Sequence, residues 1–95
     1  MIAHIVLFKW KGASKEEIEK IFSNLNKLKG KIDGLVDIFS GENLSRYSEG
    51  FEYGLVVLVK NRKSLEAYRK HPLHLEIAKQ IEKLEEKALA MDFEV

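Results

Sequence analysis

The chain has 95 residues, of which 45% are hydrophobic and 33% are charged, with 16 basic and 15 acidic side chains. This length supports a single core, so we expect one domain over residues 1–95. The absence of cysteine excludes disulfides, thiol nucleophiles and zinc sites built on cysteine. The near-zero net charge provides no long-range field to attract nucleic acid or an anionic membrane. No apolar run is long enough to span a bilayer and the start has no signal-peptide pattern, so the expected location is the cytoplasm.

The first half of the chain predicts a strand, a helix and two further strands. Residues 2–10 are β-branched and aromatic, which indicates a strand covered on both faces. Ser14 opens a Ser-x-x-Glu capping box, and apolar residues follow it at helical spacing as far as Gly30. Residues 35–41 and 51–59 predict two strands that pair as a hairpin with a long polar loop.

The second half predicts two helices and a last strand. Asn61 can cap a short helix that must end at His71, because the residue before a proline is pushed out of the α region. Pro72 fits the first turn of the second helix, since its missing N–H would have no partner there. Residues 88–95 alternate apolar side chains with small or acidic ones, which is typical of a strand.

The resulting order, β-α-β-β-α-β, predicts an α+β ferredoxin-like fold with a four-stranded antiparallel sheet. Right-handed crossovers place both helical layers on the same face of this sheet, which leaves the other face uncovered. The strands nevertheless carry apolar side chains on both faces, and exposing about six of them would cost on the order of 10 kcal/mol. We therefore expect a homodimer in which two sheets pack face to face.

Three histidines and one tyrosine lie in apolar surroundings and are the candidate functional residues. His4 is in the middle of the first predicted strand, where the two-residue alternation turns it toward one side of the sheet or the other. His74 and Tyr68 have helical spacing with core residues and should point toward the sheet, while His71 flanks the proline break. If these side chains converge, an imidazole and a phenol could act as general base and acid near neutral pH.

Each candidate also has a purely structural interpretation. A strand histidine such as His4 is commonly a hydrogen-bonded core residue, and a histidine before a proline, such as His71, can cap a helix. A metal site made of the three histidines is disfavoured, because the proline interrupts the helix and no carboxylate stands at a fourth ligand position. No metal is therefore expected, and we expect no other cofactor.

RNA recognition motifs share the element order, and Gly50-Phe51-Glu52-Tyr53 has a faint likeness to their third strand. However, Glu49 stands where those domains carry a basic residue, and the later aromatic positions are aliphatic here. RNA binding is kept only as a remote alternative, and we expect neither a nucleic acid nor a membrane as partner.

Four stretches of the sequence form a recognisable set: His4-Ile5-Val6-Leu7-Phe8-Lys9-Trp10-Lys11, Gly34-Leu35-Val36 leading to Gly41-Glu42-Asn43, Gly50-Phe51, and Leu65-x-x-Tyr68-x-x-His71-Pro72-x-His74. Together they resemble the stress-responsive A/B barrel domain (Dabb) family, nearly from end to end. The resemblance implies a ferredoxin-like subunit whose sheet packs on a partner's sheet, so that two subunits close a dimeric α/β barrel. This agrees with the dimer expected from the strand patterns.

Most members of that family have no known activity, and some are linked to plant stress tolerance and higher assemblies. One characterised relative is a plant polyketide cyclase that performs an aldol condensation without metal or cofactor, in a pocket between sheet and helices. The resemblance matches its catalytic tyrosine and histidine to Tyr68 and His74 and its strand histidine to His4. Tyr53 stands where the cyclase has a further histidine, which makes the same substrate doubtful.

We therefore expect a small apolar pocket in each subunit that binds a small organic molecule, with Tyr68 and His74 as candidate catalytic residues. His74 would abstract a proton, Tyr68 would donate a hydrogen bond to the developing oxyanion, and His4 would orient the ligand. The residues expected to contact the ligand are His4, Val6, Phe8, Phe22, Tyr53 and His71. The alternative is a non-catalytic stress-response or assembly protein. A cavity too small for a ligand, together with a bond from His74 to the backbone, would favour that alternative.

Overall fold

The computed structural model describes residues 1–95 and contains four strands and three helices. The strands are β1 (Ile2–Trp10), β2 (Leu35–Glu42), β3 (Tyr53–Val59) and β4 (Glu85–Glu94), and the helices are α1 (Lys15–Asn26), α2 (Arg62–Lys70) and α3 (Pro72–Leu84). Every expected element is present in the expected order. β3 begins two residues later and β4 three residues earlier than the sequence indicates.

Local signals in the sequence set the helix boundaries. The Ser14 hydroxyl accepts a hydrogen bond from the Glu17 backbone N–H at 3.1 Å, and the Glu17 carboxylate accepts one from the Ser14 N–H at 3.2 Å. This is the expected capping box at the start of α1. Asn61 caps α2 through its side-chain oxygen, and the break between α2 and α3 falls at His71, with Pro72 in the first turn of α3.

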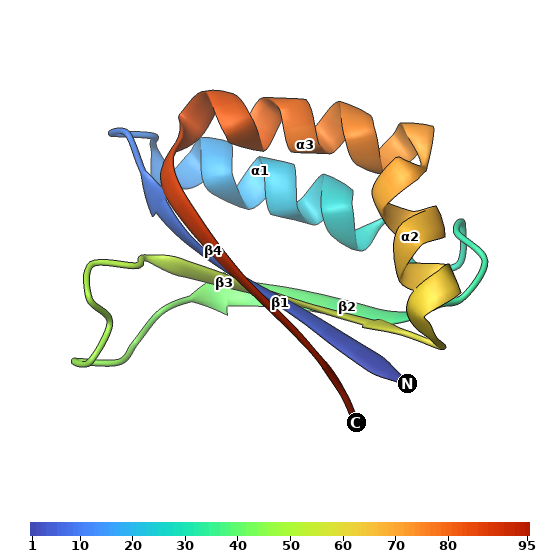
Figure 1. Ribbon diagram of the computed structural model, residues 1–95. Coiled ribbons are helices and arrows are strands. Elements are labelled where there is room, and N and C mark those ends of the chain that lie inside the picture. The colour runs from blue at the N-terminus through green and yellow to red at the C-terminus, as the bar shows by residue number, and fades with distance from the viewer.

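The sheet has the strand order β2-β3-β1-β4, and all neighbouring strands are antiparallel. Figure 1 shows α1 and α3 side by side over one face of the sheet, with α2 at one end of the same layer and no helix over the opposite face. Cross-strand pairing places His4 opposite Asp92 on the helix-covered face. Ile5 lies between Val56 and Met91 on the other face.

The core fills the space between the sheet and the helices. At one end of this space four aromatic rings form a cluster: Phe8 stacks on Trp10 with centroids 5.1 Å apart, and Phe22 packs on Tyr53 at 4.5 Å. We call these four residues the aromatic cluster. The largest side chains that are almost completely buried are Tyr68, Phe22, Leu25, Val57 and Val59.

The face of the sheet without helices is apolar and partly exposed. Met91 is 62% exposed, Leu89 54% and Phe39 50%, which is unusual for large apolar side chains on a regular sheet. We call this surface the open face. It consists of Ile5, Leu7, Phe39, Val56, Leu58, Leu89, Met91 and Phe93.

The turn before β2 depends on Gly34, which has a φ of +83°. A Cβ atom at this position would clash with the side chain of Ser64 at the start of α2, whereas one at Gly30, with a φ of +84°, would meet nothing within 4 Å. Gly34→Ala is therefore expected to lower the free energy of unfolding by about 2–3 kcal/mol, and Gly30→Ala by about 1 kcal/mol. Urea denaturation of both variants measures the difference. Equal losses would contradict a close packing constraint at Gly34.

Candidate active site

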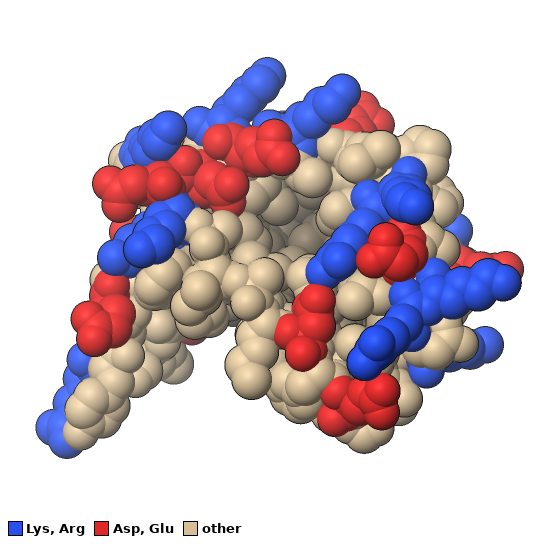
Figure 2. Space-filling model, in the orientation of Figure 1, with Lys and Arg blue, Asp and Glu red and all other residues tan.

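A cavity of about 160 Å³ lies between the helix-covered face of the sheet and the helices. Figure 2 shows the surface hollowed between the helical layer and the sheet. The lining residues are His4, Val6, Phe8, Leu25, Leu55, Tyr68, His74, Ala78, Ile81, Glu82 and Glu85. The structure thus brings together five of the residues singled out from the sequence, namely His4, Val6, Phe8, Tyr68 and His74.

Phe22, Tyr53 and His71 lie outside this cavity. Phe22 and Tyr53 pack against each other in the aromatic cluster, and Tyr53 lines a different cavity. The Nδ1 atom of His71 accepts a hydrogen bond from the Leu73 backbone N–H at 3.2 Å, so His71 caps α3 as its structural interpretation anticipated. The expectation that these three residues contact a ligand in this cavity is therefore wrong.

Tyr68 contributes a hydroxyl group that has no hydrogen-bond partner. The residue is only 1% exposed, and its ring centroid lies 4.4 Å from that of His74. Burial raises the pKa of the Tyr68 phenol above its ordinary value, so the group keeps its proton near neutral pH. A buried hydroxyl without a partner costs free energy in the folded state. It is also a donor that a bound oxygen atom could satisfy.

His74 is held in one tautomer by the backbone. Its Nδ1–H donates to the Arg69 carbonyl oxygen at 3.1 Å, which leaves Nε2 of the neutral ring as an acceptor. Burial lowers the pKa of His74, although the bond to the Arg69 carbonyl partly opposes this effect. A neutral imidazole with a free Nε2 is a proton acceptor near pH 7. The backbone bond that would favour a non-catalytic role is thus present, but the cavity of about 160 Å³ is not too small for a ligand.

His4 is oriented by Asp92 of β4. Its Nδ1–H donates to Asp92 Oδ1, and Asp92 Oδ2 accepts a hydrogen bond from the Arg69 guanidinium at 2.7 Å. Partial burial alone would raise the pKa of Asp92, but the hydrogen bonds and charges of His4 and Arg69 outweigh it and lower the pKa. Asp92 therefore stays ionised and holds the His4 ring with Nε2 free.

Asp92 and Arg69 were not among the residues that the sequence pattern singled out. A signal existed for Asp92, because it follows Ala88 and Ala90 on the same side of the alternation in the last strand. Its position opposite His4 depends on the β1–β4 register, which one sequence does not reveal. Arg69 neighbours Tyr68 on α2 but has no distinguishing pattern.

The rim of the cavity is acidic. Glu82 and Glu85 line it and no lysine or arginine does. Burial raises the pKa of Glu85, and the neighbouring charge of Glu82 adds to this effect. An anionic ligand would meet repulsion at this entrance.

The structure shows neither a metal-binding cluster nor a membrane-spanning helix. Nowhere do three or more histidine, aspartate or glutamate side chains converge in a way that could hold a metal ion. None of the three helices combines the length and apolar character that crossing a bilayer requires.

The burial of His74 predicts a pH dependence of stability. Because the pKa of His74 is lower in the folded chain than its ordinary 6.5, the unfolded chain binds more protons just below pH 6.5. Stability should therefore be fully present above pH 6.5 and decrease as the pH falls toward the folded-state pKa. Asp92 acts in a separate window, below its ordinary value of 3.8. His74→Asn should flatten the change in urea-unfolding free energy between about pH 7.5 and pH 5. An unchanged slope would contradict the burial of a neutral His74.

Comparison with known proteins places this chain in a family. The model of the Stress responsive A/B Barrel Domain matches residues 2–95. A stress-response A/B barrel domain-containing protein of Arabidopsis thaliana is 26% identical over 95 residues, with 97% of this chain and 84% of that protein covered. The family match is independent of the geometry described above.

Solved structures share the fold at lower identity. A dimeric ferredoxin-like protein of unknown function from Jannaschia is 24% identical, with a TM-score of 0.89 and coverage of 99% of this chain and 98% of that one. A hydroxynitrile lyase from Passiflora edulis is 20% identical, with a TM-score of 0.86 and coverage of 99% and 92%. The fold, the dimeric neighbours and the match over residues 2–95 agree. The chain belongs to the stress-responsive A/B barrel domain (Dabb) family.

Proposed function

We propose that the cavity lined by His4, Tyr68 and His74 is the active site of an enzyme that transfers a proton on a small, uncharged organic molecule without a cofactor. The observation that carries the proposal is the Tyr68 hydroxyl, which is buried without a partner beside His74. A buried donor next to an imidazole with a free Nε2 is an acid–base pair that lacks only a substrate.

The size and charge of the cavity define the substrate class. Its volume of about 160 Å³ is close to that of a cavity of about 150 Å³ known to hold benzene. The acidic rim of Glu82 and Glu85 disfavours carboxylates and phosphates. A carbonyl or α-hydroxy compound of about the size of one six-membered ring fits both constraints.

In the proposed reaction His74 Nε2 removes a proton from the carbon next to the carbonyl group. The electron pair of the broken C–H bond moves onto the carbonyl oxygen, and the Tyr68 hydroxyl donates a hydrogen bond to the resulting enolate. His4, oriented by Asp92, holds the substrate. Return of the proton from the His74 imidazolium to the substrate regenerates the neutral base.

Two resemblances support this chemistry. The polyketide cyclase that resembles this chain carries a tyrosine and a histidine at the positions of Tyr68 and His74. The Passiflora edulis protein with the same fold is a hydroxynitrile lyase, and cleavage of a hydroxynitrile requires removal of the proton of the hydroxyl group whose oxygen becomes the carbonyl oxygen. Both reactions need a base that removes a proton from the substrate.

We further propose that two copies of the chain associate through the open face. Leu89 and Met91 are more than half exposed on it, and no helix of the same chain covers them. Removing such side chains from water is the main driving force of association. Solved structures with this fold from Jannaschia and Thermobifida fusca are dimeric, which supports the proposal.

Deuterium exchange tests the enzymatic proposal with simple ketones in place of the natural substrate. Cyclohexanone and a panel of similar small ketones are incubated with the protein in D₂O, and loss of the α-proton signal is followed by NMR. We expect accelerated exchange with the wild type, a decrease of about 100-fold or more with His74→Gln, and no change with His71→Asn, which keeps a helix cap. Absence of exchange across the panel would contradict the enzymatic proposal and favour the non-catalytic stress-response or assembly role.

A further inference from the structure

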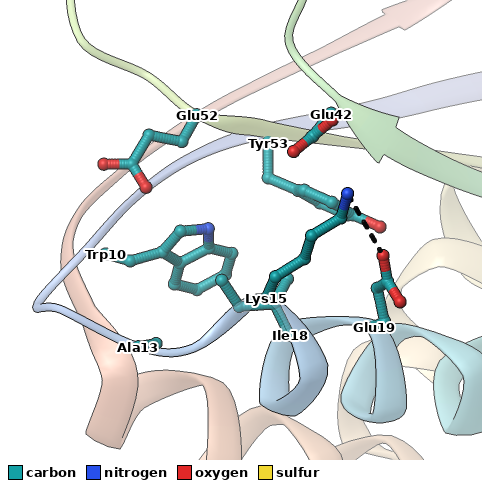
Figure 3. Close-up of a pocket in the computed structure, with 8 residues that line it drawn as sticks. All are labelled: Trp10, Ala13, Lys15, Ile18, Glu19, Glu42, Glu52 and Tyr53. Carbon is teal, nitrogen blue, oxygen red and sulfur yellow. Dashed lines mark ion pairs between the residues drawn. The ribbon is translucent and has the colours of Figure 1, made fainter.

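A second cavity, of about 270 Å³, lies where α1 begins, next to the ends of β1 and β2 and the start of β3 (Figure 3). It shares no lining residue with the candidate active site. The aromatic cluster lies between the two cavities: Phe8 lines the active-site cavity, while Trp10 and Tyr53 line the second one. The second cavity is therefore a separate place for a ligand.

The charged residues around this cavity are predominantly acidic. Glu19, Glu42 and Glu52 line it, and Lys15 is the only basic residue in the lining. Lys15 lies 4.0 Å from Glu19, so its charge is paired within α1. Glu42 and Glu52 form no ion pair, and Figure 3 shows them on the strand side of the cavity, across from α1. The cavity thus presents two uncompensated negative charges.

Trp10 provides an independent indication of a ligand site. The residue is only 7% exposed, and its indole Nε1 is buried without a hydrogen-bond partner. In Figure 3 the indole nitrogen faces the side of the cavity on which Glu52 and Tyr53 lie. A buried N–H donor without an acceptor is costly, and an oxygen atom of a bound molecule would satisfy it.

The aromatic side chains of Trp10 and Tyr53 complete the wall of the cavity, with Ala13 and Ile18 as apolar neighbours. Aromatic rings combined with carboxylates attract organic ammonium groups, since the ring faces and the carboxylates both favour positive charge. A bare metal ion fits less well, because no group of three metal-ligating side chains converges here. We propose that this cavity binds a small organic ammonium compound whose hydroxyl oxygen accepts the hydrogen bond of Trp10.

The single tryptophan of the chain makes the proposal directly measurable. Choline serves as the probe, and 3,3-dimethylbutan-1-ol, which has the same shape without the charge, serves as the matched ligand control. We expect choline to produce a saturable change in tryptophan fluorescence and a downfield shift of the one indole N–H cross-peak. The uncharged alcohol should bind at least about fivefold more weakly. Absence of saturation, or equal binding of the two compounds, would overturn the proposal.

Charge variants test which residues recognise the cation. Glu52→Gln is expected to weaken choline binding about fivefold to tenfold, because it removes one carboxylate from the wall. Glu16→Gln removes the same charge from an exposed position near the start of α1, outside the lining, and should change binding less than twofold. Circular dichroism verifies that both variants are folded. Equal weakening in the two variants would mean that only the overall charge attracts choline, which would refute a specific site.

Discussion

Tyr68→Phe is expected to make the folded chain more stable while it removes most of the catalysed proton exchange. The substitution deletes a hydroxyl group that is buried without a partner, so the free energy of unfolding should rise by about 1 kcal/mol. The same group is the proposed donor to the enolate oxygen, and its loss should decrease the exchange rate by about 100-fold or more. Urea denaturation and deuterium exchange of one ketone give the two quantities on the same preparation.

Tyr53→Phe is the matched control for this prediction. It removes the same hydroxyl group from a residue that lies outside the active-site cavity, so it should leave the exchange rate unchanged. A Tyr68→Phe variant that is destabilised, or one that exchanges as fast as the wild type, would contradict the proposed role of the hydroxyl. A gain in stability without a loss of activity would show that Tyr68 is a core residue with an unpaired hydroxyl group and has no catalytic role.

The double substitution Leu89→Lys with Met91→Lys is expected to separate the proposed dimer into folded monomers. Both side chains are more than half exposed in the single chain, so lysine at these positions costs the isolated subunit little. In a dimer formed through the open faces, the two lysine charges would be buried without partners. This costs several kcal/mol and should raise the dimer dissociation constant by about 1,000-fold or more. Light scattering during size exclusion should give twice 11.0 kDa for the wild type and 11.0 kDa for the variant.

Leu44→Lys provides the control for the dimer prediction. Leu44 is 91% exposed in the loop between β2 and β3 and is not part of the open face, so its substitution should leave the mass unchanged. A double variant that still has the dimeric mass would show that the open face is not the interface. A wild-type chain that is monomeric at micromolar concentration would contradict the dimer itself.

The starts of the three helices could be predicted from the sequence because their signals are local. The Ser14 capping box, Asn61 and Pro72 each act on hydrogen bonds within one turn of their own position. The end of the first helix could not, since apolar spacing continued to Gly30 whereas α1 ends at Asn26. The early start of β4 could not be predicted, because Glu85 to Lys87 have no strand pattern. These residues are extended because they pair with the last residues of β1, and at a sheet edge polar side chains are tolerated.

The candidate site, too, could be predicted only in part. Helical spacing and strand alternation pointed Tyr68, His74 and His4 toward one interior space, and the structure has them at one cavity. Strand alternation predicts which face of the sheet a side chain lies on, but not which residue of the next strand lies beside it. The contact of His4 with Asp92 depends on the register of two strands far apart in sequence, so it could not be predicted. Tyr53 was expected in the pocket because it stands where the resembling cyclase carries a further histidine, but its ring packs on Phe22 instead.

Histidine tautomers provide the most direct measurement of the central claim, that this cavity is an acid–base site. A long-range ¹H–¹⁵N spectrum of the imidazole rings near pH 8 distinguishes a proton on Nδ1 from one on Nε2. We expect His74 to carry its proton on Nδ1 and His71, whose Nδ1 accepts a backbone hydrogen bond, to carry it on Nε2. Added cyclohexanone should move the signals of His74 and leave those of His71 in place. A proton on Nε2 of His74, or a His74 spectrum that no small ketone changes, would contradict the proposed function.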